Sequence, residues 1–489
     1  MPPRQPAAGA FCGHKRNMEQ TITLSARLRR AFEPRFVRRV FRTALPIAAQ
    51  FLIASAVNLI DVVMIGRLGG DAVAAAGGGN QIFFLLTMVL FGINSGGSVF
   101  LSQFWGTQDL KNVRRTMGMM YLLGAAVTLL FTVGALAAPR LLVSLYIHEA
   151  PALSLAADYL FWVGLSYPMA AVSLILSMVC RCTGSLHLPT LASTLSILVN
   201  VGGNALLIYG LLGCPALGLR GAAIATTLAR LVECLVLATA IYRQKLAGAA
   251  RAKELFALDG NFVRKYLRTA WPVLLNETLW SVGFSLYTVA YGLLGTAALA
   301  AVQISSTVIQ LMTVFTRGMS NACGIFIGNM VGAGDEEGAL DYGHRFALLL
   351  PAVGLVTGLV CIALSPLFLR LYSVSDEILS LARIMLILQA LSTPLKCNSM
   401  VLIVGVFRAA GDTLHACLID NGSVWLAGVP MAFLGVWLGL PVWGVFLMVC
   451  CDDIAKNIAS LIHLRREKWI RNVSAQLQCP SLHKNPRLL

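Results

Sequence analysis

The sequence predicts an all-α integral membrane protein with twelve transmembrane helices, arranged as two six-helix bundles that are related by pseudo-two-fold symmetry. Three observations predict this fold: an apolar composition, an internal repeat and a one-sided distribution of basic residues. Hydrophobic residues make up 57% of the 489 residues and charged residues 12%, about half of the share usual in soluble domains. Because a soluble fold of this length cannot bury so much apolar surface, an ordinary cytosolic enzyme and a disordered chain are excluded.

Apolar stretches that are long enough to cross a bilayer, about 20 residues each, recur along the chain. We predict spans at 44–66, 72–104, 117–145, 152–180, 188–212, 217–242, 270–292, 298–331, 343–369, 378–407, 414–438 and 441–463. The spans divide the chain into a basic N-terminal tail, an N-lobe, a linker, a C-lobe and a C-terminal tail, with bounds 1–42, 43–242, 243–268, 269–464 and 465–489.

Lysine and arginine gather on one side of the predicted spans. With the N-terminus inside, the inner segments hold 29 of these residues and the outer loops hold 4. Cytoplasmic loops carry such an excess in membrane proteins, so we expect both tails and the linker to be cytoplasmic. The net charge of +16 then points to contact with anionic lipid and not to a nucleic-acid partner.

The chain repeats itself after 226 residues. Arg42-Thr43-Ala44-x-Pro46 aligns with Arg268-Thr269-Ala270-x-Pro272, and after one inserted residue Arg181-x-x-Gly184 aligns with Arg408-x-x-Gly411. Each repeat holds six spans, an even number, so both lobes share one orientation and relate by an axis along the membrane normal. Repeats of this kind are typical of secondary transporters that bind substrate near the bilayer midplane.

An acid deep in the first predicted span is the main candidate for ion coupling. A charge at mid-bilayer costs about 2.5–3.5 kcal/mol on insertion scales, so Asp61 suggests a function. Helical spacing puts Gln50 and Asn58 on the face of Asp61. The fifth and sixth spans add polar side chains whose oxygens suit a proton or Na⁺ and no other metal: Asn200, Asn204 and Thr226. A structural hydrogen-bond network between helices is the alternative.

A second acid lies in the seventh predicted span, on one helical face with an aromatic stripe. The stripe that follows Glu277 consists of Trp280, Phe284, Tyr287 and Tyr291. A carboxylate above aromatic ring faces can hold an organic cation, which makes this stripe a candidate substrate site. Packing of the same aromatic side chains in the core is the competing interpretation.

Lys396 in the tenth span complicates the substrate site. Its ammonium group would be costly inside the bilayer without a partner, and we hypothesise that it pairs with Glu277. Asp452 and Lys456 stand four residues apart on the last span and are expected to neutralise each other. Asp420 has no partner that the sequence makes evident.

The sequence also limits the energy source. It holds no GxxxxGK[ST] phosphate-binding motif, so an ion gradient must drive transport, and no cofactor beyond the coupling H⁺ or Na⁺ is expected. We expect a monomeric transporter and not an enzyme, with a small organic cation as substrate and membrane lipid around it. Two alternatives remain: a flippase or exporter of a lipid-linked or anionic metabolite, and a channel or non-transporting membrane protein.

An ordered set of motifs resembles the multidrug and toxic compound extrusion (MATE) family of cation-coupled efflux transporters, in its bacterial branch. The motifs are Pro46-x3-Gln50 with Asp61, Pro272-x3-Asn276-Glu277, Asn200-x3-Asn204 and the segment 405–413. The resemblance implies an antiporter of the bacterial inner membrane with two bundles around a central cleft. It also implies that Asp61, with Asn200, Asn204 and Thr226, forms the N-lobe cation site.

Overall fold

Long apolar helices form most of the fold, and a computed structural model describes residues 29–147, 150–213, 215–369 and 375–478. Residues 1–28 of the predicted N-terminal tail lie outside this part of the chain. The first half contains α2 (Pro34–Gly66), α3 (Gly70–Gly106), α4 (Leu110–Ala137), α5 (Pro139–Val143), α6 (Ala150–Gly164), α7 (Tyr167–Cys182), α8 (His187–Tyr209), η1 (Leu211–Gly213) and α9 (Gly218–Arg243).

The second half begins with the short linker helix α10. The helices are α10 (Ala252–Leu255), α11 (Gly260–Leu293), α12 (Thr296–Ala333), α13 (Glu336–Leu369), α14 (Asp376–Met400), η2 (Val401–Arg408), α15 (Thr413–Ser423), η3 (Val424–Gly428), α16 (Val429–Trp437), α17 (Val442–Arg465) and α18 (Val473–Gln478). Among the described residues, eight helices are long and apolar enough to cross a membrane, or nine if the bent pair α6–α7 forms one span.

Several predicted spans are broken where the sequence places a proline. The span expected at 117–145 ends as α4 at Ala137, and Pro139 starts the separate helix α5. The span expected at 152–180 bends by 48° between α6 and α7, where Pro168 occupies the first turn of α7. Proline lacks the backbone N–H of a helix interior and clashes with the preceding turn, so a new helix begins at these positions.

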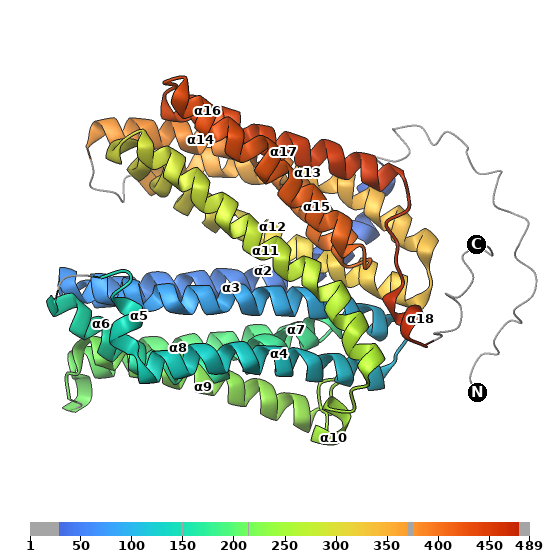
Figure 1. Ribbon diagram of the computed structural model, residues 1–489, viewed down its shortest axis with the longest axis horizontal. Helices are drawn as coiled ribbons and strands as arrows, with labels where there is room; N and C mark the ends of the chain where they lie inside the picture. Colours follow the sequence, from blue (N-terminus) through green and yellow to red (C-terminus); the bar gives the residue numbers. More distant parts are fainter. Residues whose placement is uncertain (1–28, 148–149, 214, 370–374, 479–489) are drawn as a thin grey trace, which may run out of the picture.

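The helices form two bundles, one from α2–α9 and one from α11–α17 (Figure 1). The two bundles approach each other at the end that carries α10 and α18 and diverge toward the end that carries α5 and α16. Contacts of α2 with α12, and of α3 with both α11 and α12, join the bundles. The basic linker and the chain ends therefore lie where the bundles meet.

The first turns of α2 and α11 are exchanged between the bundles. Phe36, Val40 and Ala44 of α2 lie in the buried core of the second bundle, together with residues of α12 and α13. Phe262, Tyr266 and Ala270, which stand 226 residues later, lie in the core of the first bundle. The repeat seen in the sequence is therefore a repeat of tertiary contacts.

Glycines at the helix crossings obey the same 226-residue relation. A Cβ at Gly92 of α3 would lie 2.7 Å from Leu274 of α11, and a Cβ at Gly318 would lie 2.8 Å from Ala48. Gly106 packs in the same way on the backbone of Asn329, and Gly332 on the backbone of Gln103. These reciprocal pairs are what a two-fold relation requires, and small residues allow helices in a membrane to approach this closely.

Replacing Gly332 by alanine is expected to destabilise the protein, because the added methyl group would overlap the backbone carbonyl of Gln103. Overpacking of a helix contact costs typically about 1–3 kcal/mol. The measurement is the midpoint of thermal unfolding in detergent. The matched control is Gly292→Ala, where no atom lies within 4 Å of the new Cβ. An unchanged midpoint for Gly332→Ala would contradict the close contact of α3 with α12.

The one-residue insertion between the repeats has a structural counterpart. α14 continues from Met400 into the π-helix η2, which ends at Arg408. A π-turn accommodates one extra residue within an α-helix without breaking it, and such turns are frequent at functional sites. The insertion that aligns Arg181 with Arg408 therefore falls in a segment that can absorb it. Arg408 is buried at the end of η2, although the charge count placed it in a cytoplasmic loop.

The predicted linker is ordered against the first bundle. Glu254 of α10 lies 2.8 Å from Arg114 of α4, and Arg115 lies 3.8 Å from Asp259. The pKa of the exposed Glu254 carboxyl is lowered, first by a hydrogen bond from the backbone N–H of Arg251 and then by the nearby Arg114. The linker thus connects the bundles while it packs on α4.

Candidate functional site

A polar chain crosses the first bundle between α2, α8 and α9. Asn204 Nδ2 donates to Asp61 Oδ1 at 2.5 Å, and lies 3.4 Å from Asn200 Oδ1. Asn200 Nδ2 in turn donates to Thr226 Oγ1 at 3.3 Å. The structure therefore brings together four residues that the sequence proposed for ion coupling, because Asn200 and Asn204 stand one turn apart on α8 and face α2 and α9.

One oxygen in this chain has no partner among the described residues. Asn204 is fully buried, and its Oδ1 makes no hydrogen bond. A buried carbonyl oxygen without a donor costs about 1–3 kcal/mol. Because Asp61 and Thr226 supply further oxygens nearby, the site suits a proton or a hard cation, which oxygen atoms bind best.

Gln50 belongs to a second polar cluster on the same three helices. Its Nε2 lies 3.5 Å from Ser193 Oγ, which donates to Glu233 Oε1 at 2.8 Å, and Arg230 pairs with Glu233 at 3.1 Å. Gln50 therefore does not join the hydrogen-bond chain of Asp61. The side chain of Asn58, the remaining candidate, lies outside the part of the chain that the structure describes.

Glu233 is a buried acid that the sequence interpretation missed. Glu233 stands seven residues after Thr226, which is about two helical turns, so the two side chains share a face of α9. An acid within a predicted span and in register with another candidate was the signal that could have identified it.

Glu277 does not pair with Lys396, which corrects the hypothesis drawn from the sequence. Glu277 Oε1 lies 2.5 Å from Arg408 Nη1, which also reaches Ser95 Oγ of α3 at 3.3 Å. Lys396 lies instead 4.0 Å from Asp453 of α17, with its ammonium group 5.2 Å from the ring centre of Phe446. The π-helix η2 brings Arg408 into the interior, where it takes the position expected for Lys396.

The ion pairs continue from Arg408 through the second bundle. Asp420 of α15 lies 3.9 Å from Arg408 and 3.1 Å from Lys456 of α17. Lys456 also pairs with Asp452 at 3.2 Å, the pair that the sequence predicted. Asp420, which had no evident partner in the sequence, accepts a further hydrogen bond from Asn276 at 2.9 Å. In this network, three carboxylates (Glu277, Asp420 and Asp452) meet two cations (Arg408 and Lys456).

The aromatic stripe of α11 divides into an open half and a buried half. Trp280 and Phe284 are 38% and 48% exposed, and their rings stack with centres 5.5 Å apart. Tyr287 and Tyr291 are buried, and the Tyr287 hydroxyl donates to Asp452 at 3.1 Å. The acid beside the inner half of the stripe is thus Asp452 and not Glu277.

Buried acids on packed, membrane-length helices define this chain as a multi-pass membrane protein of the transporter class. The chain belongs to the MatE family, whose model matches residues 46–206 and 272–434. The two matched segments start 226 residues apart, at the spacing of the internal repeat. The protein is a transporter of this family and not an enzyme.

Individual relatives are distant in sequence and similar in fold. The uncharacterized transporter YisQ of Bacillus subtilis is 23% identical over 93% of this chain and 99% of its own length. A probable multidrug resistance protein NorM of Thermotoga maritima is 24% identical over 89% of this chain and 94% of its own length. The MATE transporter VcmN of Vibrio cholerae superposes with a TM-score of 0.80 at 19% identity, covering 90% of this chain and 99% of VcmN.

Proposed function

We propose that this protein is a secondary-active antiporter that exports amphipathic organic cations in exchange for H⁺ or Na⁺. The observation that carries the proposal is the chain from Asp61 to Thr226, in which the buried Asn204 Oδ1 lacks a donor. Each coupling ion that moves inward along the field would supply about 2.3 kcal/mol per 100 mV. The transporter named as a multidrug resistance protein among its relatives supports drug-like substrates.

The proposal includes twelve spans and an inner-membrane location. Eight helices and the bent pair α6–α7 pass as spans on length and composition, and we add α2, α11 and α17, which pack beside them. Both chain ends and the linker then lie in the cytoplasm, where basic residues accumulate. The N-lobe and the C-lobe correspond to residues 43–242 and 269–464, and the transporter acts as a monomer.

Charge in the C-lobe supports a cationic substrate. The network of Glu277, Arg408, Asp420, Lys456 and Asp452 holds one more carboxylate than cations. Lys396 motivated the alternative of an anionic substrate, yet its charge is balanced by Asp453. The stacked and exposed Trp280 and Phe284 would offer ring faces to an organic cation beside this network.

The test is uptake of a fluorescent organic cation by inverted membrane vesicles. We expect accumulation under an imposed proton or sodium gradient and its loss when that gradient is dissipated by an ionophore. The ion whose gradient drives uptake is the coupling ion. Absence of uptake under both gradients would contradict the proposal and favour a lipid-linked or anionic substrate. Ion current without counter-transport would instead indicate a channel.

A further inference from the structure

After α17 the chain runs across the junction of the two bundles, as the segment Lys468–Ala475, which we name the C-terminal strap (Figure 1). Two of its side chains, four residues apart, are buried in different bundles. Trp469 lies in the hydrophobic core of the C-lobe, and Val473 lies in the hydrophobic core of the N-lobe. The strap therefore bridges the two lobes at the end where they meet.

The first half of the strap is held by the C-lobe. Trp469 is fully buried, its ring packs edge-on against Phe407 with centres 6.1 Å apart, and a Cβ at Gly343 would lie 3.2 Å from it. The backbone N–H of Arg471 donates to the carbonyl oxygen of Ala410 at 2.8 Å. Burial of a large ring and a backbone hydrogen bond make this end the anchor of the strap.

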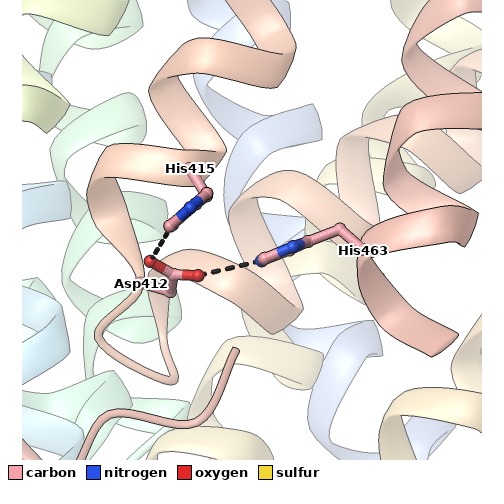
Figure 2. Close-up of side chains that lie close together, drawn as sticks. All are labelled: Asp412, His415 and His463. Atoms are coloured by element: carbon pink, nitrogen blue, oxygen red, sulfur yellow. Dashed lines mark hydrogen bonds and ion pairs between the residues drawn. The ribbon is translucent and has the colours of Figure 1, made fainter. Parts of the chain in front are cut away.

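A buried carboxylate strengthens the anchor (Figure 2). Asp412 has no exposed surface, and its two oxygens lie 2.8 Å from His415 Nδ1 and 2.8 Å from His463 Nε2. Arg471 Nε of the strap lies 3.2 Å from Asp412 Oδ1. The two imidazole rings stack at 20°, so their in-plane nitrogen lone pairs do not converge on one metal ion, and the guanidinium group adds positive charge beside them. The cluster is therefore arranged to hold Arg471.

The second half of the strap is clipped to the N-lobe by one side chain. Gln103 of α3 is fully buried, and its Oε1 accepts from the backbone N–H of Val473 at 2.8 Å. Its Nε2 donates to the carbonyl oxygens of Ala409 at 3.1 Å and Arg471 at 3.3 Å. A single glutamine thus joins α3 to both the strap and the C-lobe, next to the glycine contacts of α3 with α12.

We propose that the C-terminal strap is a latch that keeps the cytoplasmic side of the transporter closed. The strap stays with the C-lobe and releases Gln103 and Val473 when the lobes separate at that side. This inference rests on the proposed transport function, because only a transporter has to open there. The asymmetry of the contacts supports the direction of release: the N-lobe holds the strap by fewer hydrogen bonds than the C-lobe does, and through one side chain.

The first test is hydrogen exchange of the full-length protein in nanodiscs without substrate. We expect Gln103→Leu to raise amide exchange in the strap and at the C-terminal ends of α3 and α12. Gln244→Leu is the matched control, since Gln244 is exposed at the end of α9. Exchange in Gln103→Leu that equals wild-type exchange would overturn the latch. This result does not depend on transport, so it separates failure of the latch from failure of the proposed function.

The second test ties the strap to one lobe at a time. We expect a disulfide in Gln103→Cys/Val473→Cys to stop cation uptake, with recovery on reduction, because this bond prevents release from the N-lobe. A disulfide in Ala410→Cys/Arg471→Cys ties the strap to its own lobe and is expected to leave uptake equal to that of the reduced form. Mass spectrometry of the cross-linked peptides verifies each bond. Uptake by the oxidised Gln103→Cys/Val473→Cys protein, or loss of uptake in the oxidised Ala410→Cys/Arg471→Cys protein, would overturn the proposal.

Discussion

Asp61→Asn is expected to abolish gradient-driven uptake while the protein still folds. Asparagine has nearly the shape of aspartate and can still accept from Asn204 Nδ2, so the contact between α2 and α8 is kept. It cannot carry the negative charge that a proton or Na⁺ neutralises. Loss of one coupled charge forfeits about 2.3 kcal/mol per 100 mV, which corresponds to roughly a 50-fold lower accumulation ratio. The measurement is uptake of a fluorescent cation by inverted vesicles at matched protein levels.

The control for this prediction is Asp71→Asn, the same change at an exposed acid in the first turn of α3. Uptake by that variant should equal uptake by the wild type. If Asp61→Asn also transports at the wild-type rate, coupling does not depend on Asp61. The buried Glu233, which contacts Ser193 beside Gln50, would then be the acid to replace next.

The arrangement around Asp61 was accessible to sequence reasoning because its spacing is local and helical. Asn200 and Asn204 stand one turn apart, so any straight helix puts them on one face. The repeat added the long-range information, since Phe36 and Phe262 occupy equivalent buried places in opposite cores. What the sequence did not contain is the exchange itself: each of these residues packs in the lobe to which its span does not belong.

The ion pairs of the C-lobe were less predictable, because they depend on helix rotation. The wheel of a regular α-helix cannot locate Arg408, since η2 adds residues to the turn and changes the direction of every side chain that follows. Lys396 was assigned to Glu277 because both were intramembrane charges without an evident partner. The structure pairs Lys396 with Asp453, which stands beside the predicted partner of Lys456 and was overlooked.

The strap was also beyond prediction, for a different reason. Lys468–Ala475 is a short polar segment after the last span, and such segments are usually cytoplasmic tails. Its burial depends on a tryptophan that fits against Gly343 and on a glutamine more than 360 residues earlier in the chain. Neither contact leaves a periodic pattern in the sequence. Gln103, near the end of a long apolar helix, was the only polar signal.

Lys456→Met is expected to produce the largest loss of stability among single substitutions in the C-lobe. Lys456 is buried and lies 3.1 Å from Asp420 and 3.2 Å from Asp452. Removing it leaves two buried carboxylates near one remaining cation, Arg408. Removing one partner of a buried ion pair costs about 3–5 kcal/mol, because the other charge stays desolvated and uncompensated. The free energy of unfolding in mixed micelles measures the effect.

Two further variants separate loss of charge balance from loss of packing. Lys253→Met removes an exposed lysine of α10 and should leave the free energy of unfolding unchanged. Lys456→Met/Asp420→Asn removes one charge of each sign, so the network returns to its original net charge, and most of the lost stability should be recovered. If the double variant is no more stable than Lys456→Met, packing and not charge balance is what Lys456 contributes. The surplus carboxylate would then lose its energetic meaning, and with it the electrostatic support for a cationic substrate in the C-lobe.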